Sequence, residues 1–262
     1  MASDITHNQF ADIAENIRAI RDIIAQRQAQ SPYRQDVTLM AVTKTVDAER
    51  INYAIDHCGI RCIGENRVQE LCDKYPLLHL DGVSVHLIGS LQSNKVKYIA
   101  DKVDLIHSLD SLSLAKEIDR QAKKHNRIID CLIEINIGQE EAKGGIAPDI
   151  DTILAFYDAA AAFENIRITG LMTIAPNCGT SPDAKERYTA YFSETRKLYE
   201  QLCAHRLDAH PDIRPILSMG MSGSYEAAIL CGSDIVRVGS GIFGARPTVQ
   251  RVDPCPNDVG KM

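Results

Sequence analysis

Lys44 is the residue whose position points most directly to chemistry. It follows the apolar run VTLMAV at 37–42, where a buried strand is expected to end. Burial in such a place favours the neutral amine, and a neutral amine can attack an aldehyde. The alternative is a rim lysine that extends its ammonium into water, which is the more common outcome for a strand-end lysine taken alone. Lys44 is therefore a candidate nucleophile that needs support from elsewhere in the chain.

Two segments rich in glycine and serine, LSMGMSGS at 217–224 and RVGSGIFGAR at 237–246, could hold a phosphate group. In the first, an apolar run ends and a helix begins. Exposed backbone N–H groups and the hydroxyl of Ser222 or Ser224 suit a dianion there, although simple helix capping explains the same residues. In the second, three glycines let backbone amides approach a ligand closely. Each segment alone is weak evidence.

Five further polar residues are weaker candidates. Asn66 follows the second apolar run, within GENRVQE, and His86 lies inside the third, VSVHLIG. A core histidine with satisfied hydrogen bonds is at least as common there as a ligand contact. Glu134 and Asn136 share one face of the fifth run and could form a polar layer or support a ligand indirectly. Lys143 is interpreted as part of a solvated turn rather than a lid.

Short apolar runs alternate with amphipathic stretches along most of the chain. Isoleucines at helical spacing predict a long helix over residues 5–29. Strands are expected at 37–42, 61–64, 83–89, 103–108, 128–138, 166–174, 213–219 and 234–240. Helices are expected between and after them at 47–58, 65–75, 91–101, 109–125, 149–163, 180–205 and 222–232. Such alternation requires parallel strands covered by helices.

Eight strand–helix units usually close into a barrel. The predicted fold is therefore of the α/β class, a single (β/α)8 TIM barrel with an extra N-terminal helix and no second β domain. A doubly wound open sheet is the alternative, but the fingerprint GxGxxG does not follow the first strand. No linker or low-complexity tract divides the chain, so residues 1–246 are assigned to one domain and 247–262 to a loose tail.

A barrel of this kind would bring the candidate residues together. Its working site lies at the carboxyl ends of the strands, with a recurrent phosphate site in the loops after strands seven and eight. Strand one neighbours strand eight, so Lys44 would project beside that site. A phosphate site next to a reactive lysine suggests pyridoxal 5′-phosphate (PLP), held as a Schiff base on Lys44.

Arg237 is the candidate partner of the pyridine nitrogen of this cofactor. It shares a strand face with Ile235, so it can point into the barrel at the end of the strand. A guanidinium group only donates hydrogen bonds, and the nitrogen would therefore remain an unprotonated acceptor. Such a ring is a poor electron sink, which disfavours strong carbanion chemistry.

Composition excludes several classes of protein. The net charge of −6 gives no broad basic surface, so nucleic acid is not an expected partner. No apolar run approaches the ~20 residues of a membrane helix, and the opening residues MASDITHNQF lack a signal-peptide pattern, so a cytoplasmic protein is expected. The eight cysteines and eight histidines are dispersed without metal-site spacing, which predicts reduced thiols and no metal site.

Six motifs carry a resemblance to a known family: AVTKT, GENRVQE, HLIGSLQSNK, ITGLMTIAP, LSMGMS and RVGSGIFGAR. Together they resemble the YggS/PROSC family of pyridoxal phosphate homeostasis proteins, over roughly residues 5 to 246. Several ordered motifs in one chain are far more specific than any single pattern. The family is similar in fold to the barrel domain of alanine racemase and of eukaryotic ornithine decarboxylase, without their second, β-rich domain.

The resemblance implies a role for each matching residue. Lys44 would carry the Schiff base, Ser222 and Gly239 with Ser240 would bind the phosphate, and Arg237 would face the pyridine nitrogen. Asn66 and His86 complete the set of candidate cofactor-binding residues. The chain departs from the usual pattern at three places: Thr43 replaces serine, Ser90 replaces proline, and Ser240-Gly241 replaces Thr-Ala. Ser240 keeps the hydroxyl group.

The resemblance implies a carrier or regulator of intracellular PLP, with no defined catalytic reaction. Racemisation needs acid and base groups on both faces of the cofactor, and in the racemases one face is served by a second domain and a partner subunit. We expect a monomer that binds PLP and related vitamers and could pass PLP to apo-enzymes. The alternatives are a weak PLP-dependent amino-acid racemase or lyase, and a barrel that binds another phosphate ester.

Overall fold

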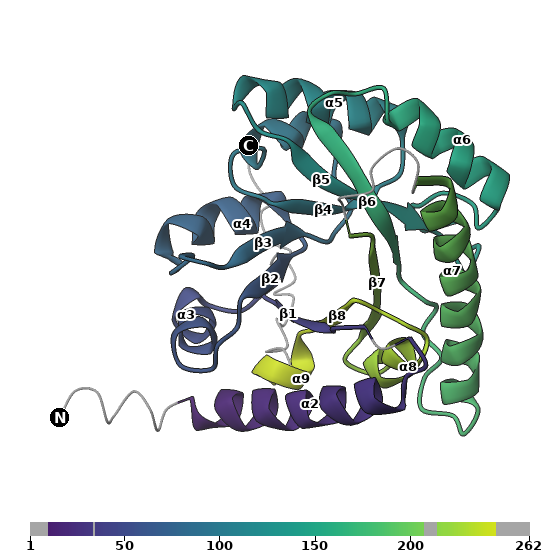
Figure 1. Cartoon of the computed structure of the whole chain (residues 1–262). Coiled ribbons are helices and arrows are strands. Elements are labelled where there is room, and N and C mark those ends of the chain that lie inside the picture. Colours follow the sequence, from purple (N-terminus) through teal and green to yellow (C-terminus); the bar gives the residue numbers. More distant parts are fainter. Residues whose placement is uncertain (1–9, 34, 207–213, 245–262) are drawn as a thin grey trace, which may run out of the picture.

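Eight parallel strands close into a barrel in chain order, as Figure 1 shows. This computed structural model describes residues 10–33, 35–206 and 214–244. The strands are β1 (Thr38–Val42), β2 (Cys62–Glu65), β3 (Ser84–Leu87), β4 (Leu105–Leu109), β5 (Ile129–Ile135), β6 (Ile166–Thr173), β7 (Ile216–Met221) and β8 (Ile235–Val238). The pairing of β1 with β8 closes the sheet, which confirms the predicted barrel and excludes the open sheet.

Helices follow the strands and surround the barrel. They are α3 (Ala48–Asp56), α4 (Val68–Lys74), α5 (Leu112–Lys124), α6 (Ile150–Ala160), α7 (Ala184–Arg206), α8 (Tyr225–Leu230) and α9 (Ser240–Phe243). A short 3-10 helix, η1 (Tyr75–Leu77), continues α4. The expected α-helix at 91–101 is wrong: the segment forms the 3-10 helix η2 (Ser93–Tyr98). Ser93 and Asn94 at its start favour turns over helix interiors.

The N-terminal helix α2 (Ala11–Gln30) takes the place of a long eighth helix in the ring. Among the described residues, the four-residue α9 is the one helix after β8. The N-terminal α2 packs against both α8 and α9, along the side of the barrel formed by β1 and β8 (Figure 1). Its buried residues are Ile13, Ile17, Ile20 and Ile24, the isoleucines whose spacing predicted the helix. The expected helix began at residue 5, and residues 5–9 lie outside the described residues, as does the tail at 247–262.

The barrel interior is a packed core rather than a pore. A cluster inside the strands contains Met40, Val42, Cys62, Ile88, Leu105, Leu132, Met172 and Ile235. A larger cluster fills the space between strands and helices. Because both faces of a parallel sheet are buried in this way, the strands appear in the sequence as nearly continuous apolar runs.

The cysteines in the described part of the chain are free thiols with no disulfide between them. Burial raises the pKa of Cys62 to about 12, so its thiol stays protonated and acts as core filling. Within the described ranges no helix is long and apolar enough to span a membrane. The same residues contain no group of three or more metal-ligating side chains close enough together to hold an ion.

Candidate functional site

A cavity of about 510 Å³ opens at the carboxyl ends of the strands. Its lining includes six of the seven predicted site residues: Lys44, Asn66, Ser222, Arg237, Gly239 and Ser240. They come from the ends of β1, β2, β7 and β8 and from the loops that follow. The volume lies in the range of roughly 300–1,000 Å³ that is typical of small-molecule sites.

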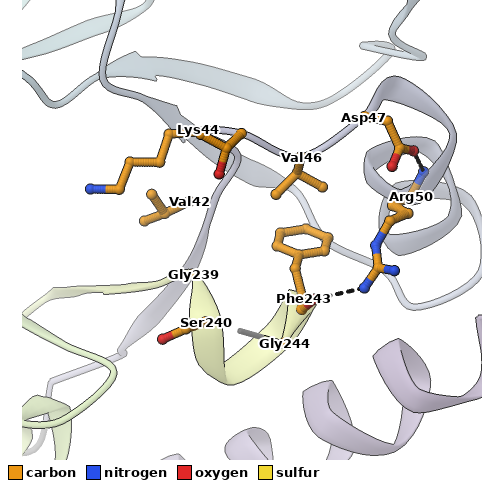
Figure 2. A pocket seen from close by; sticks show the side chains of 10 residues that line it. Val42, Lys44, Val46, Asp47, Arg50, Gly239, Ser240, Phe243 and Gly244 are labelled. Carbon is orange, nitrogen blue, oxygen red and sulfur yellow. Dashed lines mark hydrogen bonds between the residues drawn. The ribbon is translucent and has the colours of Figure 1, made fainter. Parts of the chain in front are cut away.

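Lys44 occupies the turn between β1 and α3 and is half-buried. Figure 2 shows its ammonium group and the Ser240 hydroxyl on the same side of the turn, away from Arg50. A smaller cavity of about 200 Å³, also lined by Lys44 and Ser240, extends to Arg50, which donates a hydrogen bond of 2.7 Å to the carbonyl of Phe243. Lys44 therefore borders the same cavities as Gly239 and Ser240 in the segment after β8.

The loops after β7 and β8 meet at the hydroxyl of Ser222. The backbone N–H groups of Gly239 and Gly241 both donate to Ser222 Oγ, each at 3.4 Å. Two backbone donors and a hydroxyl group thus converge from separate loops. This is the donor set that a phosphate dianion needs.

Arg237 is buried at the end of β8, with 3% of its surface exposed. Nη1 donates to Ser218 Oγ at 2.7 Å, and Nη2 donates to the carbonyl oxygen of Thr173 at 2.8 Å. Burial lowers the pKa of the guanidinium to about 10, an effect that Glu134 opposes. Arg237 is therefore still cationic at neutral pH and keeps N–H donors beyond these two bonds for a ligand in the cavity.

The comparisons with known proteins agree on one family. The family profile described as alanine racemase, N-terminal domain, matches residues 10–247. The pyridoxal phosphate homeostasis protein of Aquifex aeolicus is 42% identical over 79% of this chain and 86% of its own length. That of Escherichia coli K12 is 38% identical over 90% and 97%. This chain belongs to the pyridoxal phosphate homeostasis protein family.

A solved structure with PLP bound has a similar fold. PipY of Synechococcus elongatus, solved with PLP bound, is 32% identical to this chain and superposes with a TM-score of 0.72. The match covers 88% of this chain and all of PipY. PipY, whose fold this chain shares, is thus a protein that holds PLP.

Asn66 tests whether the cavity fits such a ligand. Asn66 lines the cavity, and its Oδ1 atom is buried with no hydrogen-bond partner within the described ranges. Gly89 packs directly on the Asn66 backbone, since a Cβ there would lie 2.2 Å from the Asn66 carbonyl oxygen. A buried acceptor without a donor is costly unless a ligand supplies one. Together with the Ser222 donors and Arg237, it fits a polar ring that carries a phosphate.

His86 is the one predicted residue that the structure does not bring to this cavity. It lines a separate cavity of about 650 Å³ at the amino ends of the strands. Its Nε2 lies 2.8 Å from Ser84 Oγ, and its Nδ1 lies 2.9 Å from His107 Nε2. Burial lowers the pKa of His86 to about 4, so the ring is neutral. The geometry matches the core-histidine interpretation, with satisfied hydrogen bonds.

Several cavity residues lie outside the motifs that the sequence singled out. Asn177 and Tyr188, from the segment after β6 and from α7, line the cavity. Lys143 was interpreted as part of a solvated turn, and it lies at the cavity edge in an ion pair with Glu140. Asn136 holds the same loop, since its Nδ2 donates to the Glu140 carbonyl at 2.9 Å. Their position in the chain could have identified them, because they follow strands five and six and so belong to the carboxyl-end face of the barrel, where the working site lies.

Proposed function

We propose that this chain binds PLP in the cavity at the carboxyl ends of its strands and takes part in intracellular PLP homeostasis. The supporting observation is the convergence of Lys44, the Ser222 donors and Arg237 on one cavity of suitable size. PLP supplies an aldehyde, and an amine condenses with an aldehyde with loss of water.

Each residue has a separate task in this proposal. Lys44 provides the amine. The backbone N–H groups of Gly239 and Gly241, with the hydroxyls of Ser222 and Ser240, hold the phosphate. Arg237 donates to the pyridine nitrogen and keeps that nitrogen an acceptor.

We further propose that the protein stores and delivers PLP rather than transforming a substrate. A buried, cationic Arg237 disfavours a proton on the pyridine nitrogen, and an unprotonated ring withdraws electrons poorly. A cytosolic monomer that supplies apo-enzymes is the form of this function that we expect. The alternative, weak racemase or lyase activity, would have to stabilise a carbanion with this poor electron sink.

Borohydride trapping tests the site. Reduction of the PLP-loaded protein should leave one pyridoxyl group on Lys44, found by peptide mass spectrometry, and the visible absorption band should disappear. Lys44→Ala should abolish the label, whereas Lys95→Ala, at an exposed position on η2, should not change it. A label on a different lysine, or none, contradicts the proposal.

Two measurements separate carrier from enzyme. In deuterium oxide with a panel of amino acids, a carrier should incorporate negligible deuterium at the α-carbon. Rapid incorporation that is lost in Lys44→Ala would favour the racemase or lyase. If the protein is a donor, apo-enzymes should draw PLP from it faster than PLP dissociates unaided, and equal rates would contradict delivery.

A further inference from the structure

Three charged side chains outside the cavity lining hold the turn that carries Lys44. They come from the GENRVQE motif and the helix it begins: Glu65 at the end of β2, and Glu70 and Lys74 on α4. We call these three residues the turn clamp. None of them lines the 510 Å³ cavity.

The turn clamp fixes the residue on each side of Lys44. Before it, Thr43 Oγ1 donates to Glu65 Oε2 at 3.0 Å, and Lys74 Nζ donates to the Thr43 carbonyl at 2.8 Å. After it, the Thr45 N–H donates to Glu70 Oε1 at 2.5 Å. Both neighbours of Lys44 are thus bound by groups that never reach the ligand.

The three charges also bind one another. Lys74 Nζ lies 2.5 Å from Glu70 Oε1 and 3.4 Å from Glu65 Oε2. The side chains are shielded from water: 1% of Glu65, 14% of Lys74 and 18% of Glu70 is exposed. Lys74 is the cation that both carboxyl groups share, so removing it would leave both of them without their partner in a shielded place.

The turn itself has an unfavourable backbone conformation. Thr45 has a φ of +62°, a region that β-branched residues rarely adopt. Such a conformation persists only when its surroundings hold it. Here the hydrogen bond to Glu70 holds the Thr45 amide, and Asp47 begins α3 by accepting from the Arg50 N–H at 2.9 Å. Without the clamp, relaxation of Thr45 would turn Lys44 to a different direction.

We propose that Glu65, Glu70 and Lys74 are positioning residues that aim the Lys44 amine into the cavity. This inference rests on the proposed function. In the step concerned, the Lys44 nitrogen bonds to the aldehyde carbon and the carbonyl oxygen leaves as water with the two amine protons. Glu70 and Lys74 act on this step, because the phosphate contacts come from the loops after β7 and β8 and the Arg237 contact comes from β8 itself.

The test compares two ligands that differ at the aldehyde. Pyridoxine 5′-phosphate has the phosphate and the ring but cannot condense with an amine. Glu70→Ala should slow covalent attachment of PLP to Lys44 by about ten- to a hundred-fold, the usual cost of a misplaced reacting group. Its affinity for pyridoxine 5′-phosphate should stay within about two-fold, since the phosphate site is intact.

Three variants complete this comparison. Glu70→Gln keeps an oxygen that can accept from Thr45, so it should retain more of the attachment rate than Glu70→Ala. Lys74→Met should slow attachment because the Thr43 carbonyl loses its donor. Gln69→Ala, at an exposed position on the same helix, should have no effect. Equal attachment rates in wild type, Glu70→Ala and Lys74→Met would overturn the proposal, as would an equal loss of affinity for both ligands.

Amide hydrogen exchange tests the turn clamp without any cofactor. The Thr45 amide hydrogen should exchange slowly with solvent in the wild type and rapidly in Glu70→Ala. Fast exchange in the wild type would overturn the clamp whether or not PLP binds. Conversely, slow exchange in a protein that binds neither ligand would leave the clamp standing and would contradict the proposed function.

Discussion

At the scale of single residues, burial sets the charge states around the site. Glu134 on β5 and Arg237 on β8 lie near each other inside the barrel, and each affects the pKa of the other. Burial, and after it the charge of Asp110, raise the pKa of Glu134 and Arg237 lowers it, with the result that the pKa is about 7. Glu134 is therefore partly protonated at neutral pH.

Glu134→Gln should change how stability depends on pH. The pKa of Glu134 is higher in the folded state (about 7) than its usual 4.5, so the folded state binds more protons between these values. The stability that this proton binding adds to the folded state is fully present below about pH 4.5 and is lost as the pH rises through 7. Relative to wild type, Glu134→Gln should gain up to about 3 kcal/mol between pH 4.5 and 8. Urea unfolding of both proteins at pH 4.5 and pH 8 measures this gain. A difference in unfolding free energy between wild type and Glu134→Gln that does not change with pH would contradict the prediction.

A chain of hydrogen bonds runs from Arg237 to the amino end of the barrel. Arg237 donates to Ser218 Oγ, which lies 3.1 Å from His107 Nδ1. His107 Nε2 lies 2.9 Å from His86 Nδ1, and His86 Nε2 lies 2.8 Å from Ser84 Oγ. Because a guanidinium only donates, Ser218 Oγ accepts from Arg237 and its own hydroxyl proton is donated to His107 Nδ1. In the same direction, His107 Nε2 then donates to His86 Nδ1, and His86 Nε2 donates to Ser84 Oγ.

The direction of this chain predicts the tautomers of both histidines. His107 and His86 should each carry the proton on Nε2, with Nδ1 as the acceptor. Both rings should be neutral at pH 7, since burial lowers both pKa values. Side-chain ¹⁵N spectra measure this directly. In Arg237→Leu the fixed donor is lost and a mixture of tautomers is expected, whereas a wild-type protein with Nδ1–H on either ring would contradict the assigned direction.

At the scale of elements, α2 completes the ring of helices around the barrel. The helix after β8 is only four residues long and covers little of β8 and β1. The isoleucine face of α2 covers this part and meets α8 and α9. Asn16 adds a polar link, donating from Nδ2 to the Ile242 carbonyl at 3.0 Å. The N-terminal helix is therefore part of the barrel's core rather than an appendage.

Ile17→Ala should destabilise the whole protein. Ile17 is 1% exposed, so the substitution leaves a cavity between α2 and the barrel. Buried Ile-to-Ala changes cost about 2–5 kcal/mol. Glu15→Ala, on the exposed face of the same helix, should stay within about 0.5 kcal/mol of wild type. Urea unfolding compares them, and a small loss for Ile17→Ala would show that α2 packs independently of the barrel.

At the scale of the whole molecule, closure of the barrel assembles the site. The pairing of β1 with β8 brings Lys44 beside a loop almost two hundred residues later in the chain, so the cavity exists only in the folded state. Any ligand that binds there must stabilise the fold, because the unfolded chain has no such site.

PLP should therefore raise the unfolding temperature. At a hundred-fold excess over Kd the gain is about 2.7 kcal/mol, which corresponds to roughly 5–10 °C for a chain of this size. Pyridoxal without the phosphate should give a much smaller shift, since the Ser222 donors stay unused. Differential scanning calorimetry measures both, and equal shifts for the two compounds would contradict the role of the loops after β7 and β8.

The sequence by itself determined the strands, the barrel and most of the site. Apolar runs separated by helical stretches are local patterns, and their strict alternation forces parallel strands and closure. The working face then followed from chain direction, which located Lys44, Ser222 and Arg237 correctly in one cavity. These predictions needed only local periodicity and the order of the elements.

Only the tertiary structure decided which polar residues meet. Periodicity shows which face of a strand a residue occupies, but its height in the barrel depends on the register between tilted strands. That register placed His86 at the amino end, next to His107, rather than at the cavity. It also brought Glu70 and Lys74 to the turn beside Lys44. Contacts between separate units depend on three-dimensional packing, and no local pattern in the chain encodes them.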